Sequence, residues 1–202
     1  MYLPRHFECH DEAALAALLH EHPLAHVVHQ GSDGGLDADP LPLLWDAGRR
    51  CLRGHVARAN PLWRTAAGRP VLAVFGGPQA YVSPNAYPSK AATHKAVPTW
   101  NYVVVHAHGM LQAHDDPAWL REFLPQLTAR HEASQPRPWS LADAPADYLA
   151  QMMRAIVGIE IVVQRLVTKV KASQNRSADD REGVARTLGT HPMAALVIDP
   201  PR

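Results

Sequence analysis

Residues 155–171 read Ala-Ile-Val-Gly-Ile-Glu-Ile-Val-Val-Gln-Arg-Leu-Val-Thr-Lys-Val-Lys and form the longest strand candidate in the chain. Their density of Val and Ile favours extended backbone, because β-branched side chains pack well on a pleated surface. Six shorter strands are predicted at 24–29, 41–45, 51–54, 70–75, 80–83 and 101–112. The strands do not alternate regularly with helices. This pattern favours a mainly antiparallel sheet or barrel over a doubly wound parallel sheet.

Helices are predicted between and after these strands, at 11–22, 117–132, 146–154 and 177–188. Asp11 and Ser177 are placed to cap the first and the last of them, Asp180 stands at the acidic position of a capping box, and Gly189 ends the last helix. A further helix start is predicted at Asn60-Pro61. We expect a single domain over residues 1–202, with helical additions at about 116–154 and 177–188.

Four stretches between these elements are predicted to be irregular. Gly31–Gly35 is a turn cluster, and Gly76-Gly77-Pro78 is expected to make a tight turn between the strands at 70–75 and 80–83. Asp46–Arg49 is expected to close a hairpin of the strands at 41–45 and 51–54. Residues 85–97 are predicted to be a polar loop.

Net charge and cysteine content restrict the class of protein. Lys and Arg number 20 against 19 Asp and Glu, which gives a formal net charge of +1. This near-balance argues against a protein that works mainly by coating nucleic acid. We interpret Cys9 and Cys51 as reduced thiols. The sequence shows neither a signal peptide nor an apolar run of membrane-spanning length, so we expect a cytoplasmic protein and no membrane partner.

The strongest chemical signal directly follows the long strand. Lys169 and Lys171 lie two residues apart and share one face of the strand end. The next residues offer hydrogen-bond donors and a guanidinium fork that suits phosphate: Ser173, Gln174, Asn175 and Arg176. The helix predicted from Ser177 adds free backbone N–H groups. The residues alone leave an anion site and a solvated basic loop equally open.

Two other segments are candidates for a ligand site. His55 and Arg58 lie between a strand and the helix start at Asn60, where they could hold an anion, whereas Asn60 itself fits a cap. Around the predicted loop, four aromatic residues accompany three hydroxyls: Tyr81, Tyr87, Trp100, Tyr102, Ser83, Ser89 and Thr99. This combination fits a pocket for a flat heterocycle. A small core under a long loop explains it equally well.

The 13 histidines give no clear site. His106 and His108 lie two apart on one strand face, as a metal pair would, but zinc needs one or two further ligands. Scattered surface histidines are the favoured interpretation, and no metal is expected. Motifs for a nucleophile elbow, a P-loop and a dinucleotide fold are absent, so no catalytic residue is assigned.

Taken together, seven segments resemble the PaiB-like family of FMN-binding negative transcriptional regulators. They occur in order at family-like spacing and span nearly the whole chain: residues 1–7 (Met-Tyr-Leu-Pro-Arg-His-Phe), 54–63 (Gly-His-Val-Ala-Arg-Ala-Asn-Pro-Leu-Trp), 75–84 (Phe-Gly-Gly-Pro-Gln-Ala-Tyr-Val-Ser-Pro), 87–90 (Tyr-Pro-Ser-Lys), 97–102 (Val-Pro-Thr-Trp-Asn-Tyr), 156–161 (Ile-Val-Gly-Ile-Glu-Ile) and 171–176 (Lys-Ala-Ser-Gln-Asn-Arg).

The resemblance implies a flavin-type split β-barrel, usually a homodimer, with FMN as the cofactor. Carried over residue by residue, it implies these cofactor-binding candidates: His55, Arg58, Asn60, Ser83, Thr99, Trp100, Lys171, Ser173, Gln174, Asn175 and Arg176. Among them we favour Arg58, Lys171, Ser173 and Arg176 for the phosphate. Trp100 and Gln174 are favoured for the ring.

One departure from the family pattern concerns the second strand. The family usually carries Asn/Thr-His-Leu-Pro there, whereas this chain has Pro40 where the His would stand. A proline has no backbone donor and suits an edge strand or a strand start.

Three functions follow from these expectations. The first is an FMN-binding regulatory or redox-sensing protein that acts on transcription directly or indirectly. The second, by fold analogy, is a flavin-dependent oxidoreductase or a haem-linked enzyme on the same barrel, in which the cofactor carries the redox chemistry. The third is a DNA-binding repressor, which only the family name supports, because no basic recognition helix is evident.

Overall fold

The computed structural model describes residues 1–201, and Arg202, the last residue of the expected domain, lies outside the described part. The strands are β1 (Glu8–Cys9), β2 (Leu24–Gln30), β3 (Leu36–Pro42), β4 (Leu44–Asp46), β5 (Cys51–Ala57), β6 (Pro70–Val82), β7 (Thr99–His114) and β8 (Ile156–Lys171). The α-helices are α1 (Glu12–Glu21), α2 (Leu62–Thr65), α3 (Ser89–Thr93), α4 (Pro117–Glu132), α5 (Ala146–Arg154), α6 (Ala178–Leu188) and α7 (Met193–Ile198). Short 3₁₀ helices are η1 (Arg5–Phe7), η2 (Pro84–Ala86) and η3 (Leu141–Asp143).

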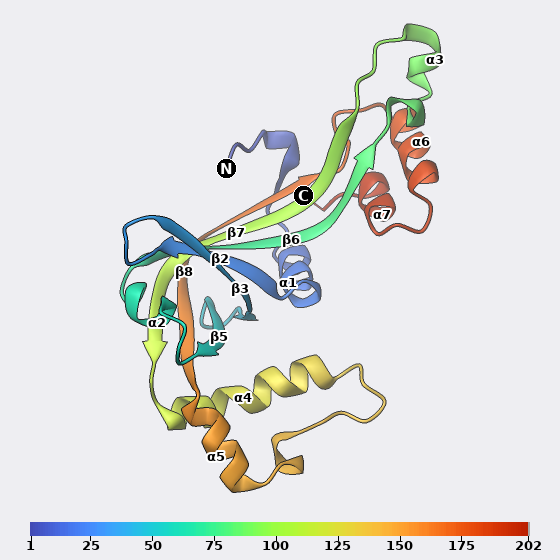
Figure 1. Ribbon diagram of the computed structural model, residues 1–202. Coiled ribbons are helices and arrows are strands. Elements are labelled where there is room, and N and C mark those ends of the chain that lie inside the picture. Colours follow the sequence, from blue (N-terminus) through green and yellow to red (C-terminus); the bar gives the residue numbers. More distant parts are fainter. Residues whose placement is uncertain (202) are drawn as a thin grey trace. The chain divides into compact units, whose positions relative to one another are not determined.

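The strands form an eight-stranded sheet with the order β3-β2-β6-β7-β8-β5-β4, and β1 pairs with β8 (Figure 1). The pairings β1–β8, β2–β3, β4–β5 and β5–β8 are antiparallel. The predicted mainly antiparallel sheet is therefore confirmed. β3 stands at the end of the order, so Pro40 and Pro42 occupy an edge strand, where a missing N–H does the least harm.

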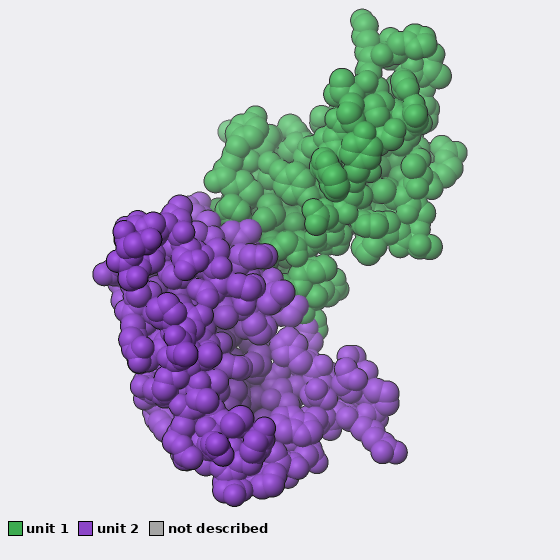
Figure 2. Space-filling view, viewed as in Figure 1, with its two compact units in different colours: residues 1–22, 75–106, 166–202 green, residues 23–74, 107–165 purple. Residues whose placement is uncertain are grey.

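The chain folds into two compact units (Figure 2). Unit 1 comprises residues 1–22, 75–106 and 166–201, and unit 2 comprises 23–74 and 107–165. Each of the long strands β6, β7 and β8 therefore contributes one part to each unit.

Unit 1 has its own apolar core beneath helices α1, α6 and α7. Its buried side chains include Val82, Val103, Val170, Val184 and Met193. Asp11 caps α1 as predicted, accepting hydrogen bonds from the Ala13 and Ala14 N–H groups. Ser177 likewise caps α6, and Gly189 follows α6 with φ of 59°.

Unit 2 contains the two-strand ribbon of β2 and β3, the β4–β5 hairpin, and helices α4 and α5. Helices α4 and α5 span the residues that the sequence predicts. Gly158 on β8 and Trp119 on α4 lie in close contact, because a Cβ at Gly158 would stand 2.3 Å from Trp119 Cζ3. The Trp119 ring in turn stacks on His114 at a centroid distance of 4.6 Å.

The predicted tight turn at Gly76-Gly77-Pro78 is wrong, because β6 runs through it without interruption. Close packing explains why a glycine is present at position 77. A Cβ on Gly77 would stand 3.0 Å from Val103 Cβ and 3.1 Å from Leu18 Cδ1. The glycine therefore allows α1 and β7 to approach this strand rather than reversing the chain.

Three other local predictions need correction, and one helix was missed. The polar loop at 85–97 contains η2 and α3, and the strand expected over 41–45 is broken at Leu43 into β3 and β4. Helix α7 was not predicted, because it begins directly after Pro192 within a short apolar run. The Asp180 carboxylate does not close a capping box; it binds Ser89 instead.

No helix within residues 1–201 combines the length and the apolar character needed to cross a bilayer.

Candidate anion-binding site

A constrained turn ends strand β8 in unit 1. Ser173 has φ of 62°, which is uncommon for a residue other than glycine, and its side chain is buried. The Gln174 side chain braces the turn: its Nε2 donates to the Val170 carbonyl at 2.6 Å, and its Oε1 accepts from the Ala172 N–H at 2.7 Å. The polar atoms of Gln174 therefore bind the backbone of this turn.

Lys171, at the end of β8, reaches across to the beginning of β7. Its Nζ donates to Thr99 Oγ1 and, at 2.6 Å, to the Trp100 carbonyl. Burial is the main cause that lowers the pKa of Lys171; the electrostatic interaction with Tyr102 raises it, and the positive charges of Lys169 and Arg176 lower it further. An ammonium in such surroundings gains from an anionic ligand.

Arg176 lies over the ring of the buried Tyr87, with Cζ 4.7 Å from the ring centroid. Lys169 and Lys171 lie 5.3 and 5.9 Å from the centroid of Tyr102. Within residues 1–201, no carboxylate forms an ion pair with these three cations. The three cations are therefore kept near one another by their contacts with aromatic rings and by their positions on and directly after β8.

A pocket of about 110 Å³ opens beside Lys171 and Arg176. Its walls are Tyr87, Val97, Pro98, Thr99, Asn101, Lys171, Ser173, Asn175 and Arg176. Asn101 Nδ2 donates to Ser173 Oγ at 2.9 Å, which leaves the Ser173 hydroxyl hydrogen available. Within the described chain, the buried Tyr87 hydroxyl and Asn101 Oδ1 have no hydrogen-bond partner. Buried polar groups are rarely left unpaired, so these two atoms mark a ligand position.

The groups around the pocket fit a phosphate. Lys171 and Arg176 supply charge, while the hydroxyls of Tyr87 and Ser173 supply neutral donors. In the opposite orientation of the Asn101 amide, Oδ1 would accept the Ser173 hydroxyl hydrogen, and the amide N–H would replace the Ser173 hydroxyl as the donor that faces the pocket. Pockets for drug-sized ligands measure about 300–1,000 Å³, so this pocket has room for a phosphate group and not for a whole flavin.

Two exposed aromatic residues stand beside this pocket. Trp100, whose carbonyl accepts the Lys171 hydrogen bond, is 54% exposed, and Tyr81 is 53% exposed. Their rings pack edge to face at a centroid distance of 5.9 Å. A tryptophan that exposes this much of its ring offers a stacking surface for a flat heterocycle.

Ser83 lies at the start of η2. Its Oγ accepts the Asn85 N–H at 3.2 Å and caps η2.

The structure brings together these predicted site residues around the pocket: Thr99, Trp100, Lys171, Ser173, Asn175 and Arg176. Gln174 supports the same turn from behind, while its side chain lines another pocket with Arg5 and His6.

The other three predicted residues belong to unit 2. Arg58 forms a bidentate ion pair with Asp115, at 2.6 and 2.8 Å, and donates to the carbonyls of Arg154 and Ile156. The hydrogen bond from Arg58 lowers the pKa of Asp115. His55 has a buried Nδ1 without a partner in the described chain, and burial lowers the pKa of its imidazole. Arg58 thus joins three segments of unit 2.

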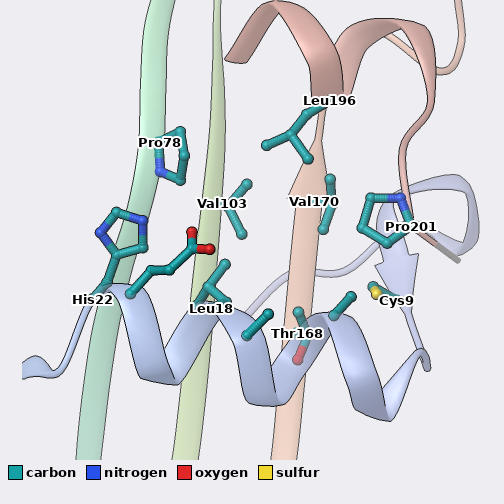
Figure 3. A pocket seen from close by; sticks show the side chains of 12 residues that line it. Cys9, Leu18, His22, Pro78, Val103, Thr168, Val170, Leu196 and Pro201 are labelled. Atoms are coloured by element: carbon teal, nitrogen blue, oxygen red, sulfur yellow. The ribbon is translucent and has the colours of Figure 1, made fainter. Parts of the chain in front are cut away.

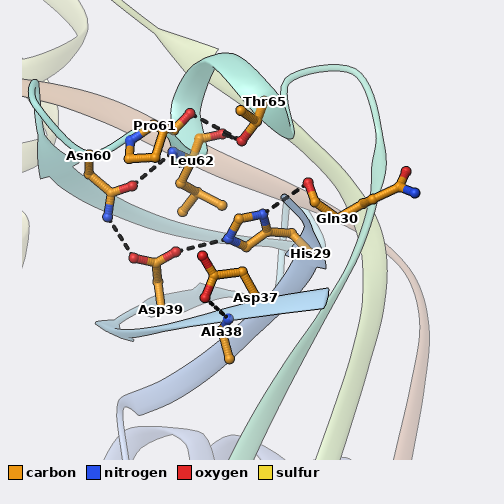
Figure 4. A network of polar contacts seen from close by, with 9 residues as sticks. All are labelled: His29, Gln30, Asp37, Ala38, Asp39, Asn60, Pro61, Leu62 and Thr65. Atoms are coloured by element: carbon orange, nitrogen blue, oxygen red, sulfur yellow. Dashed lines mark hydrogen bonds and ion pairs between the residues drawn. The ribbon is translucent and has the colours of Figure 1, made fainter. Parts of the chain in front are cut away.

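Asn60 belongs to a polar network that reaches the edge strand (Figure 4). Its Nδ2 donates to Asp39 Oδ1 at 2.6 Å, and its Oδ1 accepts the N–H of Leu62, the first residue of α2, at 2.8 Å. The N-cap position is Pro61 rather than the predicted Asn60. Asp39 Oδ2 lies 2.9 Å from Nε2 of the buried His29. Through Asp39, the residue before Pro40, this network connects β3 to β2 and to α2.

Tyr87 and Asn101 complete the pocket, and neither is among the cofactor-binding residues predicted from the sequence. Asn101 is fully buried in the alternation of β7, between Thr99 and Val103. A single amide side chain at a buried position of a strand is a sequence signal that could have identified Asn101 as a pocket residue. In the described part of the chain, no group of three or more His, Cys, Asp or Glu side chains could hold a metal ion.

Comparisons with known sequences point to one family. Residues 1–165 match the family described as "Putative FMN-binding domain". The chain is 31% identical to protease synthase and sporulation protein PAI 2 of Bacillus subtilis, over 93% of this chain and 89% of that one. It is 34% identical to an uncharacterized protein of Aspergillus fumigatus, over 66% of this chain, and the matched part spans 64% of that relative's length.

The fold also has solved counterparts. The structure of the flavocytochrome Anf3 from Azotobacter vinelandii superimposes with a TM-score of 0.62 at 16% identity, over 84% of this chain and 72% of that one. At such low identity the likeness concerns the fold alone. It confirms the expected class, a mainly antiparallel split β-barrel with flanking helices.

Proposed function

Because the chain belongs to the family described as "Putative FMN-binding domain", we propose that it binds FMN and that the pocket of Lys171, Ser173 and Arg176 holds the flavin phosphate. The observation that carries the proposal is the pair of pocket-lining cations, Lys171 and Arg176, which have no carboxylate partner in the described chain and lie beside a buried Tyr87 hydroxyl that lacks a hydrogen bond. A phosphate supplies both the negative charge and the acceptors that these groups need.

The ring of the flavin is proposed to stack on Trp100. The indole lies next to the phosphate pocket in the chain and is accessible, whereas the pocket itself is too small for three fused rings. Bound FMN supplies redox chemistry, and the residues of this chain bind and orient it. Gln174 acts indirectly, by holding the turn that presents Ser173.

In unit 2, His55 has a buried Nδ1 without a hydrogen-bond partner in the described chain, so it remains a proposed cofactor-binding residue. Arg58 and Asn60 are proposed to shape this unit, since their polar atoms are engaged by Asp115, Asp39 and backbone groups.

We further propose a regulatory or redox-sensing protein that is intracellular and homodimeric. The relative named protease synthase and sporulation protein PAI 2 supports the regulatory role. Direct DNA reading by α6 is not supported, because Arg181 donates to the carbonyls of Val197 and Ile198 and Asp180 binds Ser89. The acidic Asp179 and Glu182 occupy the same helix. An effect on transcription is therefore expected to be indirect.

The test compares FMN with riboflavin, which has the same ring and no phosphate. The purified chain should be yellow or should become so on addition of FMN, and FMN should bind more tightly than riboflavin. The variants Lys171→Gln and Arg176→Gln should weaken FMN binding and leave riboflavin binding unchanged, whereas the exposed-site controls Lys95→Gln and Arg186→Gln should alter neither.

A colourless protein that binds no added FMN would refute the proposal. Equal affinity for FMN and riboflavin would place the phosphate outside this pocket. Rapid turnover of the bound flavin by a nicotinamide donor would favour an oxidoreductase over a sensor.

A further inference from the structure

A second cavity in unit 1 lies between α1 and the strands and has a volume of about 200 Å³. It is distinct from the cationic pocket. The lining side chains come from β1, α1 and its C-cap, β6, β7, β8, α7 and the C-terminal segment (Figure 3): Cys9, Ala14, Ala17, Leu18, Glu21, His22, Pro78, Val103, Thr168, Val170, Leu196 and Pro201. All but a few of these groups are apolar.

Strand alternation separates this cavity from the cationic residues. Val103 and Val170 point into the space above α1 (Figure 3), whereas their neighbours Tyr102, Lys169 and Lys171 contact one another. Successive side chains of a strand point to opposite faces of a sheet. A molecule in the cavity would therefore lie across the sheet from Lys169 and Lys171.

Small side chains on one face of α1 create the space. Ala14, Ala17, Leu18 and Glu21 follow the helical spacing i, i+3, i+4 and i+7, so one face of the helix lines the cavity. Two of these four residues are alanines, and leucine at either position would have comparable helix propensity. The cavity is partly open to solvent, and Ala17 on its wall is exposed, so a small molecule can enter it.

The size and chemistry of the cavity select its occupant. Water needs two to four polar partners, and the only strongly polar side chains among the lining residues are Thr168 and, at the end of α1, Glu21 and His22. An apolar cavity of about 150 Å³ in another protein stays dry and binds benzene. The volume here suits one aromatic ring and is too small for a helix or a peptide strand.

We propose that this cavity is a binding site for a small apolar molecule with a single aromatic ring. Leu18, Val103 and Val170 contact the faces of the ring, and a polar substituent can reach Glu21 or His22 at the end of α1. The site does not depend on FMN, so the proposal stands or falls independently of the flavin.

The experiment titrates benzene into the full chain, with and without FMN, and records amide NMR spectra and melting temperature. Saturable shifts are expected at Ala14, Val103 and Val170, with a rise in melting temperature in both forms. The variant Ala14→Leu/Ala17→Leu fills the cavity and should lose these responses. Ala13→Leu, on an exposed site of the same helix, should keep them.

Circular dichroism establishes whether each variant is folded. If the double variant does not fold, the single variant Ala17→Leu, which changes a more exposed position, replaces it in the titration. The absence of saturable shifts in the unmodified protein would overturn the proposal. So would an undiminished response in the folded cavity-filling variant.

Discussion

The carboxylate of Asp180 on α6 accepts two hydrogen bonds from Ser89 on α3, one from the backbone N–H at 3.0 Å and one from the hydroxyl at 2.7 Å. Nearby, Gly183 lets α6 approach the same segment, because a Cβ there would stand 2.3 Å from the Ala86 carbonyl oxygen. Tyr87, which supports Arg176, lies between these two contacts in the chain. The position of α6 is thus coupled to a wall of the anion pocket.

Asp180→Ala should lower the free energy of unfolding by about 1–3 kcal/mol, because it leaves the Ser89 N–H without its charged acceptor. Urea denaturation measures the change. Asp179→Asn, one residue earlier and exposed, is the matched control and should cost less than about 1 kcal/mol. Similar losses for both variants would show that the Ser89 contact contributes little.

Binding of FMN should weaken as the pH rises through the pKa of Lys171. Burial lowers that pKa from its ordinary value of 10.5, so the loss should begin at a lower pH than for an exposed lysine. Below the pKa the ammonium is charged and attracts phosphate; above it the charge is lost. Fluorescence titrations between about pH 7 and 10 would measure the effect, with riboflavin as the reference for ring ionisation.

The matched variant for this pH dependence is Lys171→Arg, since a guanidinium stays charged throughout the range. Its ratio of FMN to riboflavin affinity should be constant with pH. An unchanged pH profile in this variant would contradict the assignment of Lys171.

Gln174→Ala should weaken FMN binding and spare riboflavin binding. The side chain holds the backbone of Val170 and Ala172, so its loss releases the turn that presents Ser173. The free energy of unfolding should also fall, by about 1–2 kcal/mol. Isothermal titration with both ligands is the measurement. An equal loss for riboflavin would assign Gln174 to the ring instead.

Gly109→Ala should destabilise the fold by about 1–3 kcal/mol or more, since a Cβ would stand 2.3 Å from the backbone oxygen of Val162 on β8. Gly76→Ala is the control: nothing lies within 4 Å of its Cβ position, and we expect a change of less than about 1 kcal/mol. Thermal unfolding of the two variants measures the difference, and equal melting temperatures would contradict the predicted clash.

Local signals in the sequence predict most elements. Asp11 and Ser177 begin helices, Gly189 ends one, and the Val- and Ile-rich run before Lys171 is a long strand. These features depend on neighbours within a few residues, so a single sequence reveals them. The same holds for the family and its cofactor, because the motifs are contiguous.

Long-range packing determines what the sequence alone could not. The sequence Gly76-Gly77-Pro78 predicts a turn. In the structure it lies within β6, and the close approach of Val103 and Leu18 explains the need for glycine there. The sequence position of Asp180 predicts a capping box. In the structure its carboxylate instead accepts a hydrogen bond from Ser89, 91 residues away in the chain.

The sequence by itself determined that Lys171–Arg176 is a basic, donor-rich segment at the end of a strand. Only the tertiary structure decided between a solvated loop and a pocket, by placing Thr99 and Asn101 beside Lys171 and Ser173. The reason is physical: charge and hydrogen-bonding capacity belong to single residues, whereas burial and the pairing of donors depend on segments that meet only after folding.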